Sequence, residues 1–362
     1  MKYNSNDKQA LSADSEKSLQ KKGQSDSANK FKVIFFTSAI MLMIFFAMSL
    51  VTGQYVVPIE DVIKIVFSNI IPIEKTWNSI QQSVILDLRL PRTVAAIIVG
   101  GALAASGATY QSIFKNPMVS PDLLGVSSGA CVGAATAILL NANSTVIQMA
   151  AFAGGLIAVM ITTMIPRLIR NESTTILVLS GIIIGSLMTS IMNIIKFVAD
   201  TDTQLAEITY WMMGSFAMIT FEEMLPLLPA IIIPIAAIML MRYRLNVLSL
   251  GDYEAKTLGI NIRKTRGIFI LCSTLSTASC VCMCGTIGWV GLVIPHTARM
   301  IIGSDNKKML PIAMIFGSIF MIFIDVLCRT ITTAELKLGI LTGLIGAPFF
   351  IFILFKQRRQ VQ

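Results

Sequence analysis

The sequence predicts an all-α, polytopic membrane protein with about ten transmembrane helices. Hydrophobic residues make up 54% of the chain and charged residues only 14%, whereas charged residues make up about 25% of an ordinary soluble domain. The apolar residues are gathered into stretches of about 20, the length that a helix needs to cross a hydrocarbon core of about 30 Å. Lysine and arginine are concentrated in alternate connecting segments, as expected of a chain that crosses a membrane repeatedly.

Ten is an even number of spans, so both termini are expected on the same side. The segments on that side carry 22 of the 29 lysine and arginine residues, and those on the other side carry 7. Because positive residues gather in cytoplasmic loops, both termini are predicted to be cytoplasmic. The predicted spans are residues 33–52, 91–112, 123–141, 146–166, 174–195, 225–242, 266–284, 286–302, 310–327 and 338–355.

The first thirty residues differ from the rest of the chain. They are rich in serine, lysine, glutamine, aspartate and asparagine and contain almost no large apolar side chains. This composition predicts that residues 1–30 are a disordered cytoplasmic tail. The tail is too long and too mixed in charge for the start of a signal peptide, so the first span is expected to be kept as an anchor.

Composition also argues against several kinds of site. The basic residues are dispersed over many loops, which gives no support to nucleic-acid binding. Cys280, Cys282 and Cys284 alternate along a predicted helix and cannot converge on one metal ion. The only histidine, His296, cannot build a metal cluster alone, and a hydrogen bond at a helix end is its expected role.

Residues 89–129 combine a charged entrance, a span of small residues and a tight turn. Pro91 is well placed to begin a helix, because its missing N–H falls among the unpaired donors of the first turn. The small residues of the span let another helix approach closely. A packing seam is the simplest interpretation, and direct contact with a substrate is the alternative. The small residues are Gly100, Gly101, Ala104, Ala105 and Gly107.

Four long motifs occur along the chain. They are RLPRTVAAIIVGGALAASGATYQSIFKNPMVSPDLLGVSSGA at 89–130, LSLGDYEAKTLGI at 248–260, GTIGWVGLVIPHTARMIIG at 285–303 and LGILTGLIGAPFFIFIL at 338–354. In this order they resemble the FecCD-type permeases, the membrane subunits of ABC importers for iron–siderophores, haem and vitamin B12. The resemblance runs from about residue 33 to residue 356. It implies that residues 31–358 form a permease domain with the type II ABC importer architecture, built from two inverted halves.

The resemblance also implies a function and a set of partners. The chain would pass an iron–siderophore complex, or a related large metal chelate such as haem or cobalamin, across the inner or plasma membrane of a prokaryote. Its partners would be ABC ATPase subunits, an extracytoplasmic substrate-binding protein and a second permease subunit, which we expect to be a second copy. Neither a cofactor nor a metal site of its own is expected.

ATP hydrolysis is expected to come from another polypeptide. The chain has no phosphate-binding Walker A motif, since residues 259–265 lack the second glycine that brings backbone N–H groups to the phosphates. The chain is therefore not expected to be an enzyme.

The loop 243–265 resembles the coupling helix that sits in a groove of the ATPase in this family. A short helix between two glycines carries apolar side chains on the cytoplasmic side and has no core of its own. A helix lying at the membrane interface is the alternative. The expected coupling residues are Leu250, Gly251, Asp252, Glu254, Ala255, Leu258 and Gly259.

Two other sets of residues match the family's transport pathway. Asn116, Met118, Ser173 and Thr174 match positions that narrow its inner mouth, although Ser173 and Thr174 also suit helix N-capping. Gly181, Gly185 and Thr189 recur every four residues and share a helix face. The resemblance implies that this face lines the path between two subunits, whereas the glycine spacing alone indicates only helix contact.

Three external arginines, Arg89, Arg92 and Arg329, match positions that receive carboxylates of the binding protein. Ordinary membrane-flanking charge is the alternative, although positive charge is scarce outside. Asp325 precedes Arg329 by four residues, so the two side chains are expected to pair on one helix.

An ion-coupled secondary transporter is the alternative function. It normally needs an ionisable residue at mid-membrane, and the centres of the predicted spans contain none. An intramembrane enzyme would need a constellation of catalytic groups, which one histidine does not supply.

Overall fold

The computed structural model describes the backbone of residues 5–68, 71–72, 74–171 and 173–361, and every regular element in these ranges is a helix. Seven helical segments are long and apolar enough to cross a membrane, and three shorter apolar helices accompany them. The all-α, polytopic fold is therefore confirmed. Each of the ten predicted spans coincides with a helix, whereas the number of complete crossings and the side of the termini stay predictions.

The helices of the first half follow the predicted spans closely. α1 spans Ser5–Val51, and its apolar part begins at Ala28. The predicted tail, residues 1–30, overlaps the start of α1. Residues 1–4 lie outside the described residues, and disorder of the tail stays a prediction. The following long helices are α4 (Leu90–Phe114), α5 (Val126–Leu139), α6 (Ser144–Leu168) and α7 (Thr174–Val198).

The second half repeats this succession after a linking helix. α10 (Leu228–Leu250) leads through the short α11 (Asp252–Thr257) into α12 (Ile262–Cys284). The last three helices are α13 (Val290–Ile302), α14 (Asn306–Thr330) and α15 (Leu338–Val361). The remaining elements are α2 (Ile59–Ser68), α3 (Ser79–Ser83), the π-helix η1 (Val84–Arg89), the 3-10 helices η2 (Pro121–Leu124) and η3 (Leu225–Leu227), α8 (Gln204–Met212) and α9 (Phe221–Met224).

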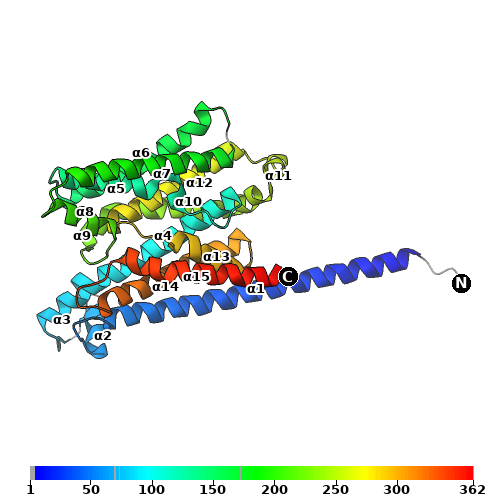
Figure 1. The fold of residues 1–362 in the computed structure, drawn as a ribbon. Coiled ribbons are helices and arrows are strands. Elements are labelled where there is room, and N and C mark those ends of the chain that lie inside the picture. Colours follow the sequence, from blue (N-terminus) through cyan, green and yellow to red (C-terminus); the bar gives the residue numbers. More distant parts are fainter. Residues whose placement is uncertain (1–4, 69–70, 73, 172, 362) are drawn as a thin grey trace.

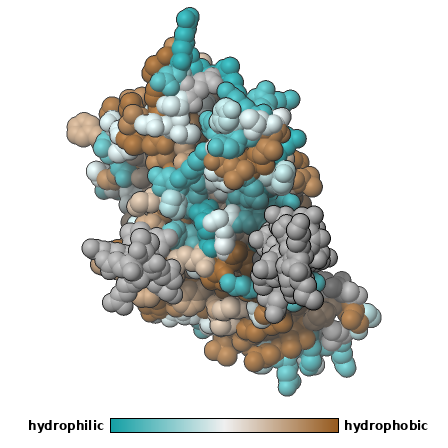
Figure 2. All heavy atoms as spheres, turned by 90° about the vertical axis from the view of Figure 1, so that its right-hand side faces the viewer, coloured by the Kyte–Doolittle hydropathy of each residue, from teal (hydrophilic) through white to brown (hydrophobic). Residues whose placement is uncertain are grey.

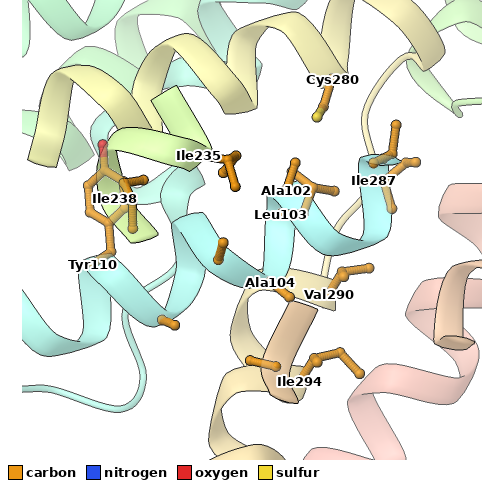
Figure 3. Packing of buried hydrophobic residues seen from close by; sticks show 14 of the residues in the cluster. Ala102, Leu103, Ala104, Tyr110, Ile235, Ile238, Cys280, Ile287, Val290 and Ile294 are labelled. Atoms are coloured by element: carbon orange, nitrogen blue, oxygen red, sulfur yellow. The ribbon is translucent and has the colours of Figure 1, made fainter. Parts of the chain in front are cut away.

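Most residues of α4 are buried, and Figure 3 shows Ala102, Leu103 and Ala104 of this helix among side chains of α10, α12 and α13. α4 packs against α10, α12, α13 and α14. A Cβ atom on Gly107 would lie 1.9 Å from the carbonyl oxygen of Gly291 in α13, and one on Gly100 would lie 2.2 Å from that of Gly317 in α14. Backbones this close leave no room for a side chain, so these glycines form a packing seam rather than a surface for substrate.

The two halves have matching sets of neighbours. α4 contacts α13 and α14, and its counterpart α12 contacts α5 and α6. α5, α6 and α7 contact one another, as do α13, α14 and α15. This exchange of partners is what a two-fold relation between α4–α7 and α12–α15 produces, and it supports the expected pair of halves.

The third and eighth predicted spans are shorter helices than the sequence indicated. The third is interrupted at Gly125, where φ is +83° and the 3-10 helix η2 gives way to α5. The eighth is preceded by residues 285–289, where Gly285 and Trp289 have φ of +73° and +71°. Hydropathy alone does not detect such breaks, because the residues on both sides of each break are apolar.

Two ends of the bundle can be distinguished (Figure 1). The start of α1, the end of α15 and α11 lie at one end, which we call the α11 end. α2, α3, α8 and α9 lie at the opposite end, the α8 end. Figure 2 looks onto the α11 end, where hydrophilic side chains cross the middle of the face and hydrophobic ones flank them. The lysine and arginine distribution predicts that the α11 end is cytoplasmic.

Candidate functional site

α7 presents a face that carries hydroxyl and amide groups. Thr189 is exposed, together with Ser186, Ser190 and Asn193. The Thr189 hydroxyl donates a hydrogen bond to the Gly185 carbonyl at 2.9 Å, and Ser190 bonds back in the same way to Ser186 at 3.1 Å. Because these hydroxyls are satisfied within their own helix, the face is mildly polar and offers few free donors to a ligand.

The three predicted pathway residues of α7 lie in different surroundings. Gly181 is buried, and a Cβ atom there would lie 2.1 Å from the carbonyl oxygen of Leu123 in η2. Gly181 is therefore a helix-packing residue in this chain. Gly185 is half-buried, and Thr189 lies on the open face. Lining of a pathway by this face stays a prediction.

The loop after α4 brings two predicted gate residues to the surface. Lys115 ends α4 in the left-handed conformation, with φ of +51°. The Asn116 side chain then accepts a hydrogen bond from the Met118 backbone N–H at 2.9 Å, which closes a tight turn. Both side chains are exposed, so they are free to meet another subunit.

The loop before α7 holds the other two predicted gate residues. Ser173 is the N-cap of α7, and its hydroxyl accepts a hydrogen bond from the Ile176 N–H at 3.3 Å. Thr174 is the first helical residue and is half-buried. The capping role foreseen for Ser173 is thus confirmed, and a gating role for the exposed loop stays a prediction.

A cavity of about 800 Å³ opens beside Asn116, between α4, α13 and α15. Arg299 donates to the side-chain oxygen of Gln111 across it at 3.0 Å, and Gln111 donates to the Leu292 carbonyl at 3.0 Å. Sequence reasoning missed this cavity, because Arg299 lies near the predicted cytoplasmic end of its span, where positive charge is expected. A basic residue inside an apolar helix was the signal that could have indicated it.

His296 also lines this cavity, but it makes no helix-end hydrogen bond. Its ring packs edge-on against Phe350, with 6.0 Å between the ring centres. Neither ring nitrogen has a hydrogen-bond partner among the described residues. The predicted hydrogen bond is therefore wrong, because α13 continues for six residues beyond His296 and places the ring against α15 instead.

α11 stands at the surface between α10 and α12. Three apolar side chains in and beside α11 are exposed: Leu250 at the end of α10 by 65%, Tyr253 in α11 by 79% and Leu258 just after α11 by 58%. Ala255 is fully buried, so its methyl group faces the body of the protein and cannot touch a partner. The expected apolar surface is present, with Tyr253 in place of Ala255.

Several contacts fix the orientation of α11. Asp252, its first residue, pairs with Arg266 of α12 at 3.1 Å. Glu254 folds back over Gly251, where a Cβ atom would lie 1.8 Å from the carboxylate. At the other end Gly259 has φ of +75°, and the Ile260 N–H bonds to the Ala255 carbonyl at 3.0 Å. α11 is thus held at both ends.

The three outer arginines lie at the α8 end, but their side chains point inward. Arg89, Arg92 and Arg329 are only 5%, 7% and 5% exposed. The Arg92 guanidinium bonds to Asp325 at 2.5 Å and to Glu335 at 2.8 Å. Arg329 lies 3.3 Å from the same Asp325, which confirms the expected pair on α14.

The other bonds of these arginines go to the end of α1. Arg89 donates to the carbonyl oxygens of Leu50 and Val51 at 2.8 and 2.9 Å, and also to that of Tyr55. Arg329 donates to the carbonyls of Ser49 and Thr52 at 2.8 and 3.0 Å. The last carbonyls of a helix carry partial negative charge and lack partners within the helix. The two arginines supply those partners, so they anchor α1 to η1, at the start of α4, and to α14.

The predicted docking role for the arginines requires guanidinium groups that a partner protein can reach. In the structure these groups are buried and already paired. Docking through them stays a prediction, and their intramolecular role is the one that the structure shows. Sequence reasoning missed the pairing of Glu335 with Arg92, which lies 243 residues away in the sequence, and the bonds of Arg89 and Arg329 to the α1 carbonyls, which are 39 and 280 residues away for Leu50 and Ser49.

An all-α bundle whose helices are long and apolar enough to cross a membrane is the architecture of a membrane-embedded protein. The chain belongs to the FecCD transport family, whose model matches residues 41–356. Members of this class are the permease components of ABC importers, which work with ATPase subunits.

Similar proteins support this assignment. The molybdate import system permease MolB of Haemophilus influenzae is 33% identical over 91% of this chain and 98% of its own length. A Helicobacter pylori protein named "Probable iron chelatin transport system permease protein" is 38% identical over 76% of this chain and 83% of its own. A solved structure described as a metal-chelate type ABC transporter in an inward-facing conformation has a TM-score of 0.81 and 32% identity, over 90% of this chain and 99% of that one.

Proposed function

We propose that this chain carries an iron–siderophore complex or a related large metal chelate, such as haem or cobalamin, into the cytoplasm. The chain would work in the inner or plasma membrane of a prokaryote, with ATP hydrolysed by a separate subunit. The observation that carries the proposal is the exposed face of α7, whose hydroxyls are satisfied internally. Such a surface lets a bulky chelate pass without holding it tightly, because it offers few unpaired donors.

A second permease subunit would complete the pathway, and we propose a second copy of this chain. The α7 face mixes its polar groups with the exposed side chains of Ile182, Ile183 and Leu187. A mixed face of this kind suits an interface that is partly helix contact and partly a path for substrate. The two loops that carry Asn116 and Ser173 would then narrow its inner mouth.

Coupling to the ATPase would go through α11. Leu250, Tyr253 and Leu258 give it an apolar surface that no described residue covers. Its fixed ends link that surface to α10 and α12. Closure of the ATPase dimer around ATP would therefore move these two helices together, and a binding protein docked at the α8 end would deliver substrate to the opened side.

A small oxyanion is the second candidate for the cargo. The relative that matches this chain over 98% of its own length is named for molybdate, and Arg299 and Lys115 line the cavity at the α11 end. Cationic groups there suit an anionic cargo. The alternative of an ion-coupled secondary transporter is not favoured, since the family consists of ATP-driven permeases.

The cargo is tested with the purified permease–ATPase complex. ATP hydrolysis would be measured with the binding protein loaded in turn with ferric siderophores, haem, cobalamin and molybdate. We expect a ferric siderophore or another metal chelate to stimulate hydrolysis most. If molybdate alone stimulated hydrolysis, the cargo would be an oxyanion and not a metal chelate.

A further inference from the structure

A groove of about 880 Å³ lies between α6 and α12 at the α11 end, next to α11 and separate from the cavity between α4, α13 and α15. Its walls are apolar over most of their length. They are formed by Leu156, Ile157, Met160, Ile268, Leu271 and Leu275. Ile157, Met160 and Leu271 are 48%, 56% and 56% exposed, so the groove is open along its side. Its volume and lining suit a hydrocarbon chain.

The end of the groove is strongly basic. Arg167 comes from the last turn of α6, and Arg263, Lys264 and Arg266 come from the first turns of α12. The N-terminus of α12 adds its own partial positive charge at the same place. Four cationic side chains and a helix N-terminus therefore meet at one end of an apolar groove, which is the charge pattern of a site for an anionic headgroup.

Arg266 links the basic end of the groove to α11. One side of its guanidinium pairs with Asp252, the first residue of α11, at 3.1 Å, and its side chain lines the groove. The acidic partner offsets part of one of the four positive charges, so the net charge of the basic end stays positive.

The exposed side of α6 indicates that the groove faces lipid. Between residues 149 and 164 of this helix, every exposed side chain is apolar: Met149, Ala153, Ile157, Met160, Ile161 and Met164. α7 differs, because its exposed face carries serine, threonine and asparagine. An apolar surface along the middle of a spanning helix is what contact with acyl chains requires. The basic end then lies at the height of the headgroups on the predicted cytoplasmic side.

From these observations we infer that the groove binds an anionic phospholipid. One acyl chain lies between α6 and α12, and the phosphate bonds to the basic residues at the end of the groove. The lipid would bridge the end of α6 to the start of α12, next to the pair that holds α11. This site depends on the membrane location of the chain and not on the cargo.

The test is lipid binding by the purified full-length chain in detergent, measured by native mass spectrometry. Phosphatidylglycerol and phosphatidylcholine with identical acyl chains are the two probes. We expect phosphatidylglycerol to bind at least tenfold more tightly. Equal affinity for the two lipids would overturn the proposal, and so would full displacement of the lipid by inorganic phosphate, which would identify a site for the free anion.

Two variants distinguish the contribution of the lipid headgroup to binding from that of the acyl chain. The double variant Arg167→Gln with Lys264→Gln removes two exposed charges from the basic end. Each of the two substitutions should weaken phosphatidylglycerol binding about fivefold. Gly267→Trp fills the groove without touching a charge. A Cβ atom on Gly267 meets no atom within 4 Å, so the variant should fold, and it should lose both lipids.

The matched control is Arg170→Gln with Arg244→Gln. Both residues are exposed at the same end but lie outside the groove. This control has the same net charge as the first variant and should keep wild-type lipid binding. An equal loss in the control would show that only the overall charge of the α11 end attracts the lipid, and unchanged binding by Gly267→Trp would remove the groove from the site.

Discussion

Replacing Asp325 with asparagine should destabilise the protein far more than replacing Glu335 with glutamine. Asp325 is fully buried and faces two arginines whose side chains are 8% and 5% exposed. Removing one partner of a buried ion pair costs about 3–5 kcal/mol, because the remaining charge is left without compensation. Here Arg329 loses the acidic group with which it forms an ion pair, whereas Arg92 keeps Glu335.

Glu335 provides the internal comparison. Its side chain is 37% exposed and pairs with the same Arg92 at 2.8 Å. An exposed ion pair contributes only about 0–1 kcal/mol, since water already solvates the charge. The two variants should therefore differ by at least about 2 kcal/mol, or roughly 30-fold in the unfolding equilibrium, at 1.36 kcal/mol for each factor of ten.

The free energy of unfolding would be measured in bicelles by steric trapping, with tags on α1 and α14. This placement reports separation of the two helices that the arginines join. Equal losses for Asp325→Asn and Glu335→Gln, or a loss below 1 kcal/mol for Asp325→Asn, would refute the conclusion that the buried network holds α1 in place.

Three further predictions concern the packing seam, α11 and the gate. Gly107→Leu should prevent correct folding, since its Cβ atom alone would lie 1.9 Å from the Gly291 carbonyl oxygen. The control Gly267→Leu, where the Cβ atom meets open space, should give a normal yield of monodisperse protein. Equal yields of the two variants would disprove the close contact. Leu258→Asp should detach the ATPase from a folded permease, whereas Ala255→Asp should lower the folded yield because Ala255 is fully buried; co-purification of ATPase at the wild-type ratio with Leu258→Asp would exclude this surface. Single cysteines at Asn116 or Ser173 should cross-link between subunits with a yield that ATP changes, and no cross-link with or without nucleotide would remove these loops from the gate.

The sequence was sufficient to predict the fold class and the location of every long helix. Hydropathy and the distribution of lysine and arginine depend only on composition along the chain, so predictions made from them do not depend on how the helices pack. The seam of α4 was also predictable, because Gly100 and Gly107 leave space that only another backbone can fill. The breaks ahead of α5 and α13 could not be seen, since apolar residues continue across them.

The direction of individual side chains was the harder part of the candidate site. Arg92 and Arg329 were expected to face a partner protein, yet they turn inward because Asp325, Glu335 and the α1 carbonyls lie within reach. Those partners are up to 280 residues away in the sequence. Charge reversal at the arginines would consequently test folding before it tests docking.

Ala255 shows the same difficulty on a small scale. In a helix of six residues, a shift of one position changes which side chain faces the body of the protein. The sequence pattern identified the apolar residues of this segment but not their rotation. The structure places Tyr253 outward and Ala255 inward, which moves the proposed ATPase contact by two residues.

ATP-driven accumulation of a metal chelate is the most direct test of the proposed function. Proteoliposomes containing the permease and its ATPase would be loaded with ATP and supplied outside with binding protein and a ⁵⁵Fe-labelled ferric siderophore, and the trapped label would be counted. We predict accumulation that requires ATP at the α11 end and is lost with Leu258→Asp. Accumulation that needs no ATP and follows an imposed proton or sodium gradient would contradict the assignment of ATP-driven chelate import.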